Sequence, residues 1–76
     1  MSNLLAQRIE ETIVPIVGAV LANISIDLEA KRIGKTSDTL MRADLPTIAE
    51  NLEQQLAMVV GPELAAIAAQ RVRDLP

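Results

Sequence analysis

The sequence contains no cysteine, no histidine and no aromatic residue. Without Cys and His the chain has no disulfide, thiolate nucleophile or imidazole base, and no zinc site of the usual kind. Without Phe, Tyr and Trp it has no platforms on which unpaired bases stack. Ten acids against seven bases give a net charge of -3, not the basic excess that phosphate backbones attract. We therefore expect no enzyme, no cofactor and no metal site, and we disfavour nucleic acid as a partner.

Apolar residues are plentiful, because half of the 76 residues are hydrophobic, which is too many for a disordered tail. One domain covering residues 1–76 is the expectation, and a monomer of about this size buries too little surface to be more than marginally stable. The run IVPIVGAVLA, residues 13–22, is ten residues long, about half of what a membrane-spanning helix needs. Glu10 and Glu11 precede it and argue against an export signal. We expect a cytoplasmic protein with no membrane contact.

The first apolar pattern predicts one long helix from residue 3 to residue 33, with Ser2 or Asn3 as its N-cap. Steps of three and four residues define its apolar stripe: Leu5, Ile9, Ile13, Ile16 or Val17, Val20, Ile24 and Leu28. Pro15 lies inside the pattern and predicts a kink or a break there. Lys31, Arg32 and Gly34 are typical of a helix end. Residues 24–28 also alternate as a short strand does, but no partner strand is apparent.

Two shorter helices follow a polar connection at residues 35–43. Asp44, standing before Leu45 and Pro46, favours the start of one helix, and Gly61-Pro62 favours its end and the start of the last. We find no repeat, linker or low-complexity segment. The sequence therefore predicts an all-α protein, a small bundle of three main helices completed by dimerisation. The alternative is a monomer in which Pro15 breaks the first helix and the short front piece folds back as a fourth helix.

The segment at residues 30–45 resembles a helix-turn-helix. Ala30, Ile33, Gly34 and Leu40 fall where that motif places its small residue, buried residue, turn glycine and apolar anchor. Four bases accompany them: Lys31, Arg32, Lys35 and Arg42. This resemblance implies the alternative function, a small DNA-binding regulator.

Self-association is the preferred function. A helix from residue 3 to residue 33 would be about 45 Å long, twice the length of the later helices, so half of it would stay uncovered. An exposed apolar surface of that kind marks an interface, and a two-fold axis lets it cover its own copy. We expect a homo-oligomer, with room for a further protein partner, whose interface consists of Ile13, Val14, Val17, Gly18, Leu21 and Ala22.

Overall fold

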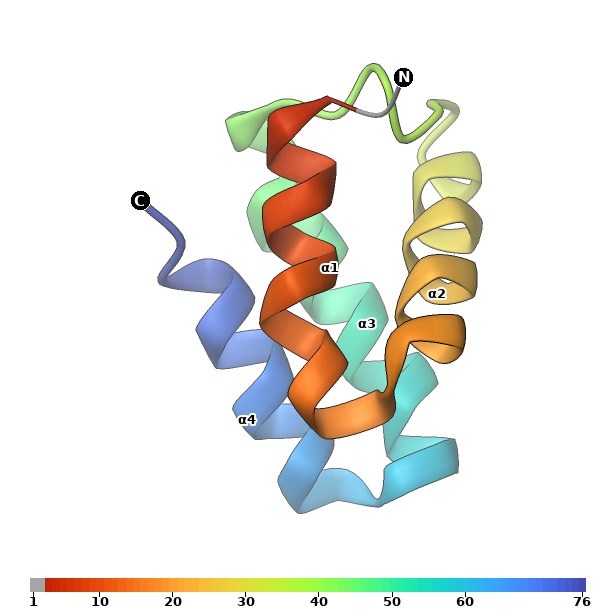
Figure 1. The fold of residues 1–76 in the computed structure, drawn as a ribbon, viewed down its shortest axis with the longest axis vertical. Helices are drawn as coiled ribbons and strands as arrows, with labels where there is room; N and C mark the ends of the chain where they lie inside the picture. The colour runs from red at the N-terminus through yellow and green to blue at the C-terminus, as the bar shows by residue number, and fades with distance from the viewer. Residues whose placement is uncertain (1–2) are drawn as a thin grey trace.

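The computed structural model describes residues 3–76, and these form four α-helices and no strand. The helices are α1 (Leu4–Val17), α2 (Ala19–Arg32), α3 (Leu45–Val60) and α4 (Pro62–Arg73), and a 3₁₀ turn, η1 (Arg42–Asp44), precedes α3. Each helix runs opposite to the one before it, so the chain makes an up-down-up-down bundle (Figure 1). The expectation of an all-α fold is confirmed, and the count of three main helices is corrected to four.

The long first helix of the sequence prediction is two helices, and the break lies at Gly18 rather than at Pro15. α1 continues through Pro15 to Val17. Pro15 is exposed, as is Glu11, the residue whose carbonyl loses its helical partner, so water can replace that bond. Gly18 has φ 86° and ψ 162°, a conformation that is essentially restricted to glycine. The helix therefore reverses where the backbone permits it.

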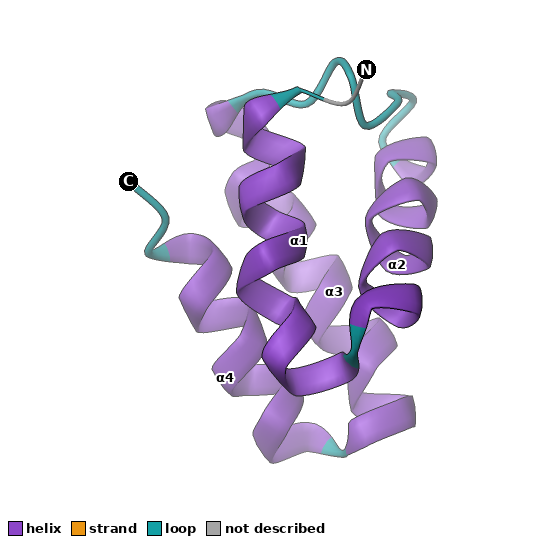
Figure 2. Ribbon diagram, viewed as in Figure 1, coloured by secondary structure: helices purple, strands orange, loops and turns teal. Residues whose placement is uncertain are grey.

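The corner between α3 and α4 has the same construction as the corner between α1 and α2. Gly61 has φ 92° and ψ 161° and, like Gly18, is the only residue between two helices. The Gly18 N–H donates to the Val14 carbonyl at 2.8 Å, and the Gly61 N–H donates to the Ala57 carbonyl at 3.2 Å. Figure 2 shows both corners as short loop segments at the same end of the bundle.

Buried positions recur at an offset of 43 residues, the same offset that separates Gly18 from Gly61. Seven pairs of buried residues are related by this offset: Ala6 with Ala49, Ile9 with Leu52, Ile13 with Leu56, Ala22 with Ala65, Ser25 with Ala68, Ile26 with Ala69, and Glu29 with Val72. The chain thus consists of two helix-glycine-helix halves that share one core. The expectation of no internal repeat is wrong. The repeat is seen in the burial pattern, and few of the paired positions hold the same amino acid.

Residues at the helix termini account for where the helices begin and end. Ser2 lies outside the described residues, and Asn3 caps α1: its Oδ1 accepts from the Ala6 N–H at 2.8 Å. α2 closes at Gly34, whose φ is 75°, as the sequence predicts. Residues 24–28 are helical, which settles the strand alternative. Asp44 precedes α3 as predicted, but its side chain makes no cap bond to α3.

Candidate association surface

The outward face of α2 carries three exposed large aliphatic residues in a row. Val20, Ile24 and Leu28 are spaced by four residues on one side of the helix and are 76%, 54% and 39% exposed. We call these three residues the α2 stripe. In the single long helix of the sequence prediction they belonged to the buried stripe, but the break at Gly18 resets the helix phase and turns them outward.

Helix α4 provides an internal comparison, because it occupies the equivalent place in the second half. Glu63 stands where α2 has Val20, and Arg71 stands where α2 has Leu28. Only the middle position is apolar in both helices, with Ile24 in α2 and Ile67 in α4. In α4 the same fold accommodates charged residues at the two ends of the stripe, where α2 has apolar ones.

Further exposed apolar residues lie at the end of the bundle that holds both glycine corners, the end shown in Figure 2. Met58 and Val59, in the last turn of α3, are 90% and 60% exposed. No charged residue occurs between residues 13 and 26, or between residues 54 and 62. Exposed aliphatic side chains without charges among them are typical of surfaces that are covered in an assembly.

The predicted interface residues fall into two groups. Ile13 and Ala22 are completely buried in the core of their own chain, so the expectation that they face a partner is not met. Val14, Val17 and Leu21 are half-buried, and Gly18 is exposed at the corner. This second group lies at the α1–α2 corner, beside Val20 of the α2 stripe.

The four predicted nucleic-acid residues do not form a binding helix. Residues 33–41 are loop and turn, so the recognition helix that the resemblance implied is absent from this described segment. Lys35 Nζ lies 2.7 Å from Asp44 Oδ2, and Arg32 Nε lies 3.6 Å from Glu29 Oε2. Lys31 and Arg42 are exposed, the first in the last turn of α2 and the second in η1.

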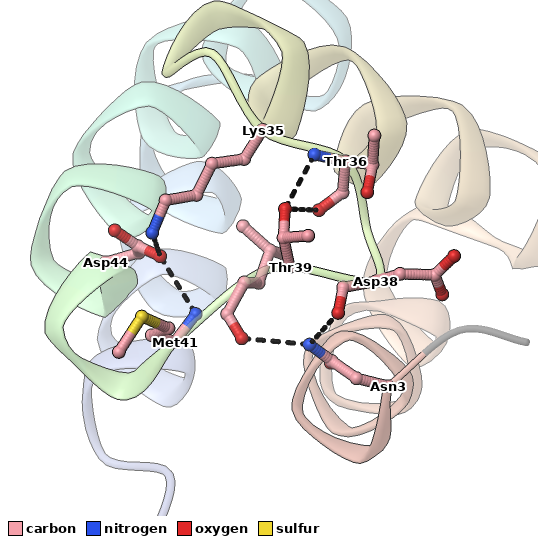
Figure 3. Close-up of polar contacts among 8 residues, drawn as sticks. Asn3, Lys35, Thr36, Asp38, Thr39, Met41 and Asp44 are labelled. Atoms are coloured by element: carbon pink, nitrogen blue, oxygen red, sulfur yellow. Dashed lines mark hydrogen bonds and ion pairs between the residues drawn. The ribbon is translucent and has the colours of Figure 1, made fainter.

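Hydrogen bonds hold the loop between the two halves in place (Figure 3). Asn3 Nδ2 donates to the carbonyls of Asp38 at 3.1 Å and Leu40 at 2.8 Å, which joins the start of α1 to the loop. Asp44 Oδ2 accepts from the Met41 N–H at 2.8 Å as well as pairing with Lys35. These two donors, Lys35 first, lower the pKa of Asp44. The loop is a structural connection in which Lys35 is paired with Asp44.

A polar group inside the bundle was missed by the sequence analysis. Ser25 and Glu29, one turn apart on α2, are both completely buried. Gln55 Nε2 on α3 donates to Ser25 Oγ at 3.1 Å, whereas neither carboxylate oxygen of Glu29 has a hydrogen-bond donor in the described chain. Burial raises the pKa of Glu29, and the nearby Arg32 opposes this in part. The α4 equivalents of Ser25 and Glu29 are Ala68 and Val72. An alignment of the two halves of the sequence would therefore have indicated that Ser25 and Glu29 are buried.

Other kinds of site find no support among residues 3–76. These residues enclose no pocket and hold no cluster of three acidic side chains suited to a metal ion. None of their helices has both the length and the apolar character needed to cross a bilayer. Comparison of the chain with protein families, with characterised proteins and with solved structures finds no match. The apolar surface of α2 is therefore the feature on which a functional proposal rests.

Proposed function

We propose that this protein is a non-enzymatic association module that binds a second copy of itself through the outward face of α2 and the adjoining α1–α2 corner. The observation that carries the proposal is the contrast between α2 and α4: Val20 and Leu28 stand where the second half of the same fold carries Glu63 and Arg71. A second protein partner on this surface, and a cytoplasmic location, belong to the same proposal.

A copy of the same chain suits this surface for electrostatic reasons. The chain carries a net charge of -3, so two copies repel each other least where no charged side chains face each other across the contact. The uncharged segment at residues 13–26 includes Val20, Ile24 and the α1–α2 corner. A two-fold axis passing beside α2 would place one stripe against the other.

Sedimentation equilibrium from 1 to 200 μM, at neutral pH, tests the proposal. The weight-average mass of the wild type should rise above the 8.2 kDa of one chain as its concentration increases. Val20→Glu should abolish this rise. Full burial of one such side chain is worth roughly 1.5–3 kcal/mol. Because Val20 is 76% exposed, covering it on both copies contributes about 2–4 kcal/mol, so its loss weakens association by about 100-fold.

Leu4→Glu is the matched control. Leu4, like Val20, is an exposed aliphatic residue in the first turn of its helix, at 62% exposure, but it lies at the other end of the bundle. The control should associate like the wild type. The double variant Val20→Glu/Leu28→Arg, which copies α4 and keeps the net charge, should be monomeric and folded. A wild type that stays at the mass of one chain throughout the concentration range, both at neutral pH and at pH 5, contradicts the proposal.

The nucleic-acid alternative stays a prediction from the sequence with no structural observation in its favour. Two of its four bases lie beside carboxylates and the segment lacks the second helix that would enter a groove.

A further inference from the structure

Helix α2 buries a carboxyl group that the fold does not need. In the second half of the chain Val72 fills the equivalent place, so a small aliphatic side chain suffices for packing. Glu29 instead brings two oxygens into the interior, and neither has a hydrogen-bond donor among the described residues. A buried carboxylate without donors is costly in its ionised form, much less so when neutral.

Few charges near Glu29 offset this cost. On its own helix Arg32 lies at 3.6 Å, but the side chain of Arg32 is 55% exposed and therefore screened by water. The residues that α1 and α3 bury in the core are uncharged: Ala6, Ile9 and Ile13 from α1, and Leu45, Ile48, Ala49, Leu52 and Leu56 from α3.

The other charged side chains of these two helices are turned elsewhere. Arg8, Glu11 and Glu50 are exposed, Glu10 is half-buried, and Glu53 lies 3.7 Å from Arg73 of α4. Next to α3, Asp44 of η1 is paired with Lys35. Arg32 is thus the one described charged group that acts appreciably on the carboxyl.

Helix α2 is also held weakly by its packing. The residues that it buries are Ala22, Ser25, Ile26, Glu29 and Ala30, of which Ile26 is the only large apolar one; Leu21 is half-buried and packs against the same core. Glycines with positive φ stand at both ends, Gly18 at 86° and Gly34 at 75°. A segment with little buried apolar surface between two glycines is a candidate for local opening.

We propose that Glu29 is a proton-controlled latch: its neutral carboxyl keeps α2 in the bundle, and its ionisation lets α2 open as a unit at Gly18 and Gly34 so that the carboxylate reaches water. In the closed state the pKa of Glu29 is raised, so the closed state binds a proton more tightly than the open one. Closure is therefore favoured at low pH and weakens as pH rises through the window between the open-state and closed-state pKa values.

The latch also controls the association surface, a consequence that rests on the proposed function. The α2 stripe and Glu29 lie on the same helix, so an opened α2 no longer presents a fixed apolar face. Self-association should then weaken as pH rises. The Glu29→Gln variant keeps the general charge effects of pH and loses only the contribution of Glu29.

Amide hydrogen exchange at pH 5, 6, 7 and 8, expressed as protection factors, tests the latch in the intact chain. In the wild type the factors of α2 should fall by up to about tenfold per pH unit between the open-state and closed-state pKa values, where opening releases one proton, and should level off above the closed-state pKa. Those of α3 and α4 should change much less. In Glu29→Gln, and in Glu29→Val, which copies Val72, the factors of α2 should not depend on pH.

Two results would overturn the latch. Wild-type α2 factors that do not change with pH would show that no proton is linked to opening. An equal fall in all helices would show that ionisation destabilises the whole bundle and not α2 alone. Neither result bears on the proposed self-association. Conversely, a chain that stays monomeric at every pH would refute the proposed function but would not affect the interpretation of the exchange data.

Discussion

Replacement of Gly61 by alanine tests whether the two single-glycine corners determine the fold. Gly61 has φ 92° and ψ 161°, a region that L-residues rarely enter. A Cβ built at this position meets no atom within 4 Å. Any destabilisation by L-alanine must therefore come from the backbone conformation and not from a clash.

The expected cost of Gly61→Ala is about 1–3 kcal/mol, the usual range for a residue held in such a region. A chain of this length is stable by roughly 4–11 kcal/mol, so the variant should still fold. Its melting temperature should fall by about 5–20 °C, because 1 kcal/mol corresponds to roughly 4–8 °C in small domains. Gly18→Ala should cost a similar amount, since Gly18 has nearly the same φ and ψ and equally open surroundings.

Urea unfolding followed by circular dichroism at 222 nm provides the measurement, and chemical synthesis provides the control. D-alanine favours positive φ, so a chain with D-alanine at position 61 should match or exceed the stability of the wild type, because the unfolded state loses conformational freedom. Equal destabilisation by L- and D-alanine would refute the reasoning, since it would implicate the side chain and not the backbone.

Two further substitutions test the contacts at the other end of the bundle. Asn3→Ala removes the cap bond to Ala6 and both bonds to the Asp38 and Leu40 carbonyls, and should cost about 1–3 kcal/mol in a urea titration. Asn3→Ser keeps a side-chain oxygen that can cap α1 and should lose less, so an equal loss would contradict the assigned roles. Asp44 has a lowered pKa, so its contribution to stability is present above the unfolded value of 3.8 and is lost as pH falls through the folded-state pKa. The difference in melting temperature between the wild type and Asp44→Asn should shrink over that acid range, and a constant difference would show that the pair with Lys35 has no linkage to folding.

The sequence predicted the helix boundaries where capping chemistry determines them. Asn3, the Gly61-Pro62 pair and the glycine after Arg32 and Ile33 each mark an end that the structure confirms. These signals work because a cap or a positive φ depends on residues that are close in sequence. The position of Asp44 before α3 was predicted correctly, but its role was not. Its carboxylate accepts from Lys35 Nζ and the Met41 N–H instead of capping the first turn of α3.

The break at Gly18 could not be read from periodicity, and most errors follow from it. The apolar spacing continues through Pro15 and Gly18 without interruption, so the pattern suggests one helix and places Val20, Ile24 and Leu28 inside. Once the chain reverses, α2 acquires its own phase and turns Glu29 inward. A hydrophobicity pattern predicts that a glutamate is exposed. The burial of Glu29 is indicated only by its equivalence to Val72, which is buried in the second half, and this equivalence is recognised through the shared core.

The most direct measurement of self-association through α2 is an isotope-filtered NOE experiment on an equal mixture of ¹³C-labelled and unlabelled chains at about 200 μM. The filter retains only contacts between different copies. The account predicts intermolecular NOEs to the methyl groups of Val20, Ile24 and Leu28, and none to those of Leu4 or Met41. Intermolecular NOEs confined to Leu4 and Met41, or an absence of any intermolecular NOE at this concentration, would contradict it.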